Sequence, residues 1–480
     1  MNEPTGAGAR LRKDSRIGII GGGCGGVHLA HLLKQRGFAH VTVLEREHRI
    51  GGKACSPIHR GFPHEMGACY IPPHYSEFIR LMARYGVGRL TAPKVYERSV
   101  FTTALGGGLR EHHLASFVQG TYDALARVDK MPRGGNLMRL LALLGAIRRY
   151  HRLRRRLLGQ GYHPLARRPS PAAMAELALP FMDMVERHRL HAMLPYFWLA
   201  SSGQGYGVLE TIPTLYALLW NQPALVSAFV LTRLGLSRRP VVQMVDVGTQ
   251  TLFERIVEED GLDVRLGVTV RSVARPASGP VTVTAETPEG PAEFVFDDIV
   301  VATDFRASLQ FLGPDANETE LFQAQTASTF VTNLIETPRW AAGALKAYVI
   351  DALTPGATFS VAGVRDIHFS WPDAQSDRCA AVAYQYVDRP PDAALLADLD
   401  ARLRPEMARL GFADVTLVQR RQWSYFPRFT ADGVARGLPW EVFERQGRNR
   451  TWYAGSSACF ESLNDVMNYN LLLTQTFAEA

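Results

Sequence analysis

The first part of the chain combines short apolar runs with a glycine-rich turn, a pattern that predicts one βαβ unit. Residues 16–20 (Arg-Ile-Gly-Ile-Ile) form an apolar run typical of a buried parallel strand. Glycines interrupt this run at 21–26, and apolar residues then recur at helical spacing over 27–36. A second buried strand is expected at 41–44, followed by Glu45. Strand, turn, helix and strand in this order define the unit.

The pattern in the rest of the chain predicts a helical middle between strand-rich segments. From about 76 to 242 most of the chain is expected to be helical, with long Leu/Ala/Met-rich segments at 136–158, 172–200 and 208–236. One further helix is expected over 392–410. Strands are expected at 264–273, 281–285, 294–302, 330–335, 347–353, 380–387 and 415–425. The last unit, 450–480, is again strand, turn and helix, so we expect it to share a sheet with the first unit.

Composition narrows the class of protein. A chain of 480 residues with 46% hydrophobic and 21% charged residues is ordinary globular material, long enough for several domains. Its five cysteines are scattered without ligand spacing, so we expect neither a disulfide framework nor a metal site. The net charge is +7, yet the basic residues do not gather in one module with aromatic residues, which argues against nucleic acid.

The termini and the most apolar segment predict a cytoplasmic protein. No apolar stretch before a small-residue cleavage site occurs at 1–16. The most apolar later segment, 215–236, contains Asn221, Gln222 and Pro223 in its middle, which disfavours a membrane-spanning helix.

The glycine run fits the GxGxxG pattern of a dinucleotide-binding turn. Gly21 permits a tight turn, Gly23 permits close approach of a diphosphate, and Gly26 permits close packing of helix on strand. Cys24 and Gly25 lie in the same turn. The N-terminus of the following helix supplies free N–H donors and positive potential. Glu45 stands where a carboxylate accepts hydrogen bonds from an adenosine ribose, and Arg46 follows it.

A second glycine pair decides between NAD and FAD. The stretch 49–56 (Arg-Ile-Gly-Gly-Lys-Ala-Cys-Ser) resembles the element that wraps the diphosphate in the flavoprotein family of amine oxidases and phytoene desaturases. There the basic residue, here Lys53, adds counter-charge. Segments 64–68, 296–303 and 451–455 resemble further FAD-site segments of that family. The resemblance implies non-covalently bound FAD and contacts from Gly52, Lys53, Met66, Gly67, Ala68, Val270, Gly455, Ser456, Asp465 and Val466.

The chain also resembles the polyenoic fatty acid isomerases, over nearly its whole length. The stretches that carry this resemblance are 14–26, 44–57, 65–68, 179–181, 205–207, 248–250, 423–427 and 447–455. In that family FAD accepts a hydride from an allylic carbon and returns it to another carbon. The resemblance therefore implies an isomerase that acts on a largely apolar small molecule.

Three departures from the isomerase pattern concern the substrate and the cofactor. The arginine expected after Pro93-Lys94 is shifted or lost, since Val95-Tyr96-Glu97-Arg98 follows. Gln204 replaces an aromatic residue before the Gly-Tyr-Gly step, and Ser456 replaces an acid. We expect Gln204, Tyr206 and Tyr425 to line the substrate pocket, with Trp423 on the same strand face as Tyr425.

Two alternatives to isomerisation follow from the same residues. A desaturase or an amine oxidase-like enzyme, reoxidised by oxygen, would share the first step, the transfer of a hydride from the substrate to FAD. A lipid- or prenyl-binding protein without flavin would share the fold. The Arg-rich segment 148–156 could belong to a helix that rests on anionic lipid, but a solvated basic face is the preferred interpretation. The oligomeric state stays open.

The predicted architecture is α/β. It consists of a discontinuous Rossmann-like FAD-binding domain (14–80, 243–305 and 448–480), a mixed-sheet substrate domain inserted into it (within 81–242 and at 306–447), and a helical cap in 81–242.

Overall fold

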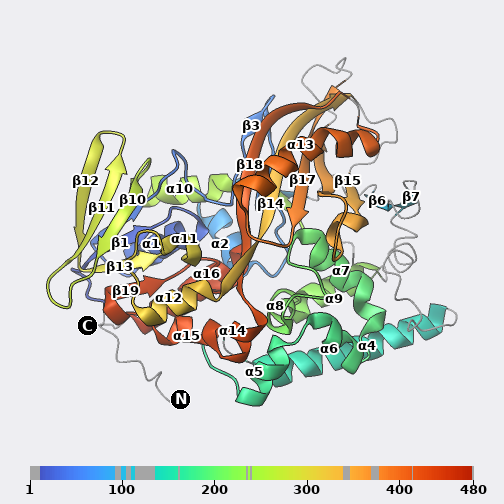
Figure 1. The fold of residues 1–480 in the computed structure, drawn as a ribbon, viewed down its shortest axis with the longest axis horizontal. Coiled ribbons are helices and arrows are strands. Elements are labelled where there is room, and N and C mark those ends of the chain that lie inside the picture. The colour runs from blue at the N-terminus through green and yellow to red at the C-terminus, as the bar shows by residue number, and fades with distance from the viewer. Residues whose placement is uncertain are drawn as a thin grey trace.

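The computed structural model describes residues 11–91, 99–103, 110–113, 136–160, 163–233, 236–237, 241–338, 346–368, 378–412 and 414–477. Figure 1 shows two sheets side by side, with most of the helices between and below them. The segment 93–98, where the sequence departs from the isomerase pattern, lies outside the described residues.

A five-stranded sheet in the order β19-β13-β1-β2-β9 gathers strands from three distant parts of the chain. Its members are β1 (Arg16–Ile20), β2 (His40–Leu44), β9 (Asp263–Arg265), β13 (Asp298–Val301) and β19 (Thr451–Tyr453). All pairings are parallel. The expectation that the first and last units share a sheet is confirmed, because β13 joins β1 to β19.

Helix α1 (Cys24–Gln35) packs on β1 and β2, and it also packs against α16 (Leu463–Thr476) from the other end of the chain. Five further helices belong to the same part of the fold as this sheet. They are α2 (Ser76–Arg84), α10 (Gln250–Asp260), α11 (Phe305–Ser308), α12 (Ala316–Gln323) and α15 (Leu438–Glu444). The side chain of Asn470 on α16 donates to the carbonyl oxygen of Gly25 on α1 at 2.8 Å. Helix α1 begins three residues earlier than its apolar spacing predicts, directly inside the glycine turn.

Two predicted strands are wrong in extent, because each is split between two sheets. The run 264–273 divides into β9 and β10 (Thr269–Ala274). The run 294–302 divides at Asp297 into the end of β12 (Gly290–Phe296) and β13. Strands β10 and β12 flank β11 (Val281–Thr287) in an antiparallel three-stranded sheet. Continuous apolar runs do not reveal where a chain leaves one sheet for another.

A seven-stranded mixed sheet in the order β18-β14-β17-β16-β15-β6-β7 forms the second large layer. The prediction that 76–242 is mainly helical fails here, since β6 (Ser99–Thr103) and β7 (Arg110–His113) join this sheet. The segment 347–353 is only partly strand, because β15 ends at Val349 and a 3₁₀ turn follows over Ile350–Leu353. The other strands are β14 (Gln325–Pro338), β16 (Val361–His368), β17 (Arg378–Val387) and β18 (Thr416–Phe429), and α13 (Ala393–Arg409) packs on them.

The predicted helical middle is otherwise present as a group of helices below the seven-stranded sheet (Figure 1). They are α4 (Asn136–Leu158), α5 (Pro171–Ala178), α6 (Phe181–Arg187), α7 (Leu194–Ala200), α8 (Thr214–Trp220) and α9 (Pro223–Arg233), joined by α14 (Ala431–Ala435). By length and composition, no single helix in the described part of the chain could cross a membrane. Helix α8 and residues 223–231 of α9 pass such a test only together, and they are bent by 59°.

Two short antiparallel pairs complete the described elements. Strand β3 (Ile58–His59) forms a hairpin with β4 (Phe62–Pro63), and β5 (Leu90–Thr91) pairs with β8 (Met244–Val245), which is distant in sequence. All five cysteines are free thiols. Among the described residues, no group of His, Cys, Asp and Glu side chains could hold a metal ion.

Candidate active site

A cavity of about 680 Å³ runs from the glycine turn of the parallel sheet to the seven-stranded sheet and the helices below it. One end is lined by Gly21, Gly23, Glu45 and Gly52, and the other by Tyr196, Phe229 and Tyr348. A cleft at the carboxyl ends of parallel strands, between two domains, is the usual place for a dinucleotide and its substrate. This single cavity brings together residues more than 400 positions apart in the sequence.

The N-terminus of α1 presents free backbone donors to the cavity. Gly23 is the N-cap residue and no side chain caps the helix, so the first N–H groups keep their hydrogen-bonding capacity. Gly21 has a φ of +114°, which a residue with a side chain adopts only at a cost. The turn therefore has the geometry and potential that favour a diphosphate.

Three glycine segments converge around this turn. The N–H of Gly51 donates to the carbonyl oxygen of Gly22 at 2.9 Å. A Cβ added to Gly25 would lie 2.7 Å from the Cα of Gly455, too close for the two backbones to keep their positions. A Cβ added to Gly23, in contrast, would find its nearest neighbour, the Cα of Gly52, at 3.6 Å. Gly23 therefore has only ordinary van der Waals neighbours, and it lines the cavity without a side chain.

Glu45 lies in the cavity wall at the end of β2, as predicted, and it is almost fully buried. One carboxylate oxygen accepts the Gly22 N–H at 2.6 Å, and the other accepts the Glu47 N–H at 2.8 Å. A carboxylate has about four acceptor positions, so capacity for a ribose hydroxyl remains. Glu45 also fixes the shape of the glycine turn, a role that the motif alone does not indicate.

Lys53, the basic residue that follows the second glycine pair, forms an ion pair with an acidic residue. The ammonium group of Lys53 lies 2.6 Å from a carboxylate oxygen of Glu461, which also accepts the Phe426 N–H at 3.0 Å. Lys53 also lies over the Tyr425 ring, 5.9 Å from its centroid. Lys53 therefore ties the second glycine loop to β18 and to the segment before α16, and Glu461 offsets part of its charge.

Most of the predicted cofactor residues line the cavity. Those that do are Gly21, Gly23, Cys24, Gly25, Glu45, Arg46, Gly52, Lys53, Gly67, Ala68, Val270, Gly455, Ser456 and Val466. Burial raises the pKa of Cys24, so its thiol stays neutral beside the turn. Cys459 is buried and does not line the cavity, and burial raises its pKa.

Three predicted residues stand outside the cavity wall, each with a structural role. A Cβ on Gly26 would lie 1.9 Å from the carbonyl oxygen of Gly21, so Gly26 serves helix packing. Met66 is fully buried, and its carbonyl oxygen accepts from Thr332 and Trp423, at 2.8 Å in each case. The Asp465 side chain accepts a hydrogen bond from the Ser462 hydroxyl at the start of α16.

The predicted pocket residues Gln204, Tyr206 and Tyr425 all lie in the cavity wall, close together. The Tyr206 and Tyr425 rings stack with centroids 5.7 Å apart, and the Tyr425 hydroxyl donates to the Gln204 carbonyl oxygen at 3.3 Å. Trp220 lies 4.6 Å from the Tyr206 ring. Burial raises the pKa of Tyr206, so its hydroxyl remains protonated, and it donates to the Glu461 carbonyl oxygen. The arrangement is an aromatic wall with its polar groups turned to backbone acceptors.

Beyond this wall the cavity continues between α7, α9 and the segment 241–242. Sequence reasoning missed these residues, which are Tyr196, Leu199, Ala200, Leu225, Phe229, Val241 and Val242. Aromatic and aliphatic residues at helical spacing are usually core, and nothing local distinguishes those that face a cavity. The weak signal was the bend at Asn221-Gln222-Pro223, which separates α8 from α9 and turns α9 along the cavity.

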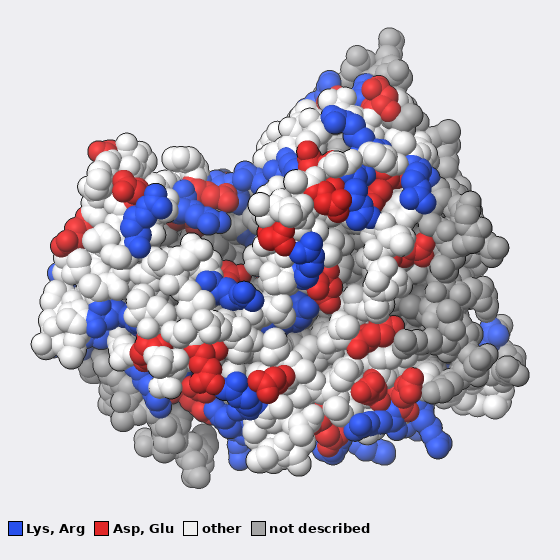
Figure 2. Space-filling model, in the orientation of Figure 1, with Lys and Arg blue, Asp and Glu red and all other residues white. Residues whose placement is uncertain are grey.

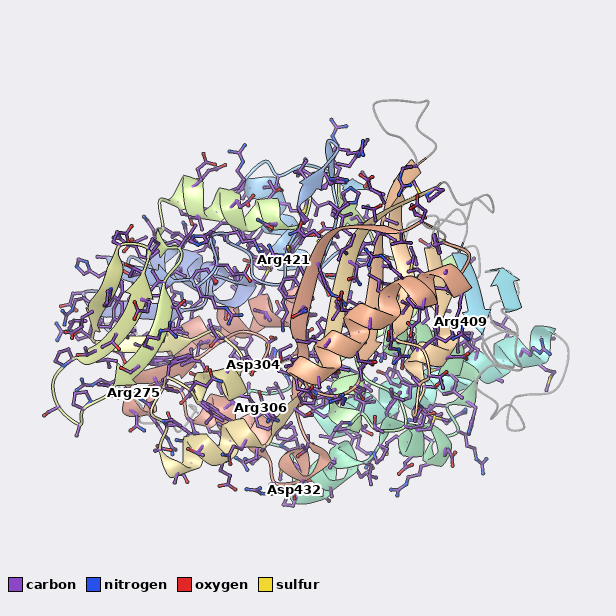
Figure 3. The ribbon with its side chains drawn as sticks, turned by 45° about the horizontal axis from the view of Figure 1, so that its top comes forward. Arg275, Asp304, Arg306, Arg409, Arg421 and Asp432 are labelled. Atoms are coloured by element: carbon purple, nitrogen blue, oxygen red, sulfur yellow. The ribbon has the colours of Figure 1, made fainter. Side chains whose placement is uncertain are left out.

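Asp304 joins the two sheets at the middle of the cavity and was also missed. One carboxylate oxygen caps α11 through the Arg306 N–H at 2.9 Å, and the other accepts the Ser424 hydroxyl of β18 at 2.7 Å. Figure 3 shows Asp304 and Arg306 between the three-stranded sheet and β18. Asp304 stands right after the strand that ends at Val301, a position where helix caps are common.

Comparison with known proteins identifies the family. The model of the "Flavin containing amine oxidoreductase" family matches residues 25–423, most of the chain. This chain belongs to that family. Its cofactor is FAD, and it is an FAD-dependent oxidoreductase or isomerase rather than a flavin-free binding protein.

Similarity to individual proteins is consistent with membership of this family. The polyenoic fatty acid isomerase of Ptilota filicina is 22% identical, over 95% of this chain and 93% of its own length. The crystal structure of a CLA-producing fatty acid isomerase from P. acnes superposes with a TM-score of 0.75 at 22% identity, covering 98% of this chain and all of that one. Putrescine oxidase bound to putrescine gives a TM-score of 0.62 at 18% identity, with 97% and 98% covered.

The residues present fit FAD. The uncapped α1 N-terminus and the absence of a side chain at Gly23 suit the diphosphate, and Glu45 suits a ribose. The cavity is long enough to reach from there to the aromatic wall. The contacts of individual residues with FAD, and its non-covalent binding, stay predictions.

Proposed function

We propose that this enzyme isomerises a double bond in an unsaturated, largely apolar chain of the fatty acid class. A hydride leaves an allylic carbon, and a hydride returns to a different carbon of the same molecule. The observation that carries this proposal is the cavity end beyond the aromatic wall, lined by Tyr196, Leu225, Phe229 and Val241. The names of the relatives that match over almost the whole chain support the same substrate class.

The reaction balances without an external oxidant. Removal of a hydride takes two electrons from the substrate and leaves an allylic cation. Return of the hydride at the far end of that cation restores the formula with the double bond moved. FAD, when bound, supplies the group that accepts and gives back the hydride.

The residues of the wall hold and shield the substrate. Tyr206, Tyr425 and Phe330 line the same part of the cavity, and aromatic rings attract a developing positive charge. The aliphatic and aromatic lining excludes water, which would otherwise capture the cation. Positioning of the donor carbon then supplies most of the rate.

The ionisable groups described at this end do not supply a general base. Glu461 is held by Lys53 and by the Phe426 N–H, and burial raises the pKa of Tyr206. A hydride shuttle needs no proton transfer, so this chemistry agrees with the proposal. Abstraction of a proton from an amine or a ketone would need a free base here.

Isotope labelling tests the proposal. The holoenzyme is incubated with linoleic acid and other polyunsaturated fatty acids that carry deuterium at the doubly allylic carbon. We expect an isomer of unchanged mass with deuterium at a new carbon and no oxygen consumed. Hydrogen peroxide formed together with a product two hydrogens lighter would overturn the proposal and identify a desaturase or oxidase.

Substrate selection should depend on Gln204, whose side-chain amide donates only a long hydrogen bond, 3.4 Å, to the Leu199 carbonyl oxygen. Gln204→Phe removes a polar group from the wall, and we expect the ratio of kcat/KM between a fatty acid and its methyl ester to change about tenfold or more. Gln419→Phe on β18, outside this cavity wall, is the matched control. Equal ratios in both variants would remove Gln204 from the substrate site.

A further inference from the structure

The outer face of α4 carries a row of exposed leucines that continues as a row of arginines. Steps of three or four residues place side chains on one face of a helix. Six residues follow such steps along α4: Leu137, Leu141, Leu144, Arg148, Arg152 and Arg155. All six are exposed. At 1.5 Å per residue the row is about 27 Å long.

The exposed apolar residues of the molecule are concentrated at this end of α4. Leu137 is 68% exposed, Leu141 54% and Leu144 41%, and the neighbouring Met138 is 58% exposed. Elsewhere in the described chain, exposed large hydrophobic residues are mostly single. A contiguous exposed apolar patch usually marks a surface that binds a partner or a membrane.

The inner face of α4 packs on the core mostly from Ala146 onward, after the partly buried Leu143. The opposite face of the second half is buried through Ala146, Tyr150, Leu153 and Leu157. The Tyr150 hydroxyl donates to the Asn221 carbonyl oxygen at 2.6 Å. These contacts fix the direction of the helix, and its first half extends beyond them (Figure 1). The exposed leucines are therefore not explained by packing.

The charged residues of α4 are all basic. Its 23 residues include seven arginines and no Asp or Glu. Three other arginines bind within the protein: Arg149 to the carbonyl oxygens of His188 and Arg189, Arg154 to that of Leu218, and Arg156 to Glu176. Among the described residues, no carboxylate pairs with Arg148, Arg152 or Arg155. Figure 2 shows basic side chains at the lower right edge of the molecule, with acidic side chains beside them.

We propose that the outer face of α4 docks on an anionic lipid bilayer, with Leu137, Leu141 and Leu144 among the acyl chains and Arg148, Arg152 and Arg155 on the headgroup phosphates. An apolar row that ends in unpaired arginines matches the boundary between hydrocarbon and phosphate. This proposal reverses the preferred interpretation of the basic segment from its sequence. The reason is that the leucines, which a solvated face would not expose, lie on the same face as the arginines.

A second copy of the chain fits this face less well. Two such helices packed antiparallel would set leucines against arginines, and a parallel pair would set arginines against arginines. Neither arrangement offers the acidic partners that the row lacks. A bilayer offers both an apolar layer and phosphates.

The docking surface is connected to the cavity through α7. Tyr150 of α4 packs against Phe197, with ring centroids 5.3 Å apart, and the adjacent Tyr196 lines the apolar cavity end. Helix α9, which contributes Leu225 and Phe229 to that end, exposes Leu231 near its own end. Docking would therefore place this apolar cavity end on the side of the molecule that faces a bilayer containing an apolar substrate. This last step alone rests on the proposed function, whereas docking does not.

Vesicle flotation of the FAD-loaded enzyme, without substrate, tests docking. We expect flotation with vesicles of phosphatidylcholine and phosphatidylglycerol, at least tenfold less with phosphatidylcholine alone, and a decrease as salt is raised. Because turnover is not measured, the outcome is independent of whether the enzyme is an isomerase.

Two variants and two controls localise the contact. The double variant Leu137→Ser/Leu141→Ser, and the triple variant with Gln in place of Arg148, Arg152 and Arg155, should each lose at least tenfold in binding and keep FAD. Val295→Ser on β12 and Arg255→Gln on α10 are exposed elsewhere and should bind like the parent. Equal flotation of all variants, or none by the parent, would overturn the proposal. A dimer in solution that the leucine variant converts to a monomer would overturn it too, in favour of a second copy.

Discussion

At the scale of single residues, the glycines of the first turn have two different roles, backbone packing and cofactor binding. The GxGxxG motif alone does not tell them apart. Gly25 and Gly26 leave room for protein backbone, because their added Cβ atoms would lie 2.7 Å from Gly455 Cα and 1.9 Å from Gly21 O. Gly23 leaves room for something else, since nothing lies within 3.5 Å of its added Cβ. A side chain at Gly23 should therefore affect cofactor binding and not folding.

Gly23→Val is predicted to weaken FAD binding at least a hundredfold, or about 2.7 kcal/mol, while the FAD-free protein unfolds like the parent. The valine methyl groups would narrow the space beside the α1 N-terminus where the diphosphate is predicted to bind, next to the Gly51–Gly52 backbone. Fluorescence titration with FAD and thermal unfolding of both FAD-free proteins measure the two effects. Gly25→Ala is the contrast, because it should lower the stability of the FAD-free protein as well. FAD affinity unchanged in Gly23→Val would refute the assignment of the diphosphate site.

At the scale of elements, the start of α16 combines a buried acid with a helix N-terminus. The Ser462 hydroxyl accepts the Asp465 N–H at 3.0 Å and donates to the Asp465 carboxylate. A helix N-terminus favours a negative charge. Burial acts against it and is the larger effect, because it raises the pKa of Asp465 to about 6.

Asp465→Asn is predicted to remove a pH dependence of stability. The pKa of Asp465 in the folded chain, about 6, lies above the usual value of 3.8. The folded chain then binds more protons than the unfolded chain between about pH 4 and pH 6, so the free energy of unfolding decreases as pH rises through that window. The decrease amounts to about 3 kcal/mol at most.

Urea unfolding at half-unit steps from pH 4 to 7 measures this dependence. The free energy of unfolding of the parent relative to Asp465→Asn should fall over the window. Asp432→Asn is the control, because Asp432 is an exposed acid in the first turn of α14 (Figure 3). Parallel curves for the parent and Asp465→Asn would show that Asp465 is not protonated in the folded chain.

The elements that the sequence predicted correctly are those whose signals are local. The strand, glycine turn and helix of 16–36 follow from adjacent residues, and Glu45 follows from its position at the end of β2. The addition of β6 and β7 to the far sheet depends on pairing with β15, more than 200 residues away in sequence, which no local pattern encodes. For the same reason the substrate end of the cavity was missed, since Tyr196 and Phe229 are ordinary core residues by spacing.

At the scale of the whole molecule, the predicted FAD site brings together segments from the two ends of the chain. The turn at 21–26, the pair Gly51–Gly52 and Gly455 meet at one point, and Lys53 reaches Glu461. Glycine-to-glycine contacts bury little apolar surface, so they contribute little of their own to stability. A bound group that touches all three segments should therefore hold them together more strongly than the protein does alone.

Removal of FAD is predicted to lower stability and to loosen these segments selectively. FAD at a thousandfold excess over its Kd contributes about 4 kcal/mol by mass action, and Tm should fall by several degrees without it. Hydrogen–deuterium exchange should increase on FAD removal at 21–26, 51–53 and 455–466. Strand β11 and helix α13 contribute no residue to the cavity wall and should exchange as before. Gly23→Val should respond to neither addition nor removal of FAD. A uniform change along the chain, or none, would mean that the three segments do not form the cofactor site.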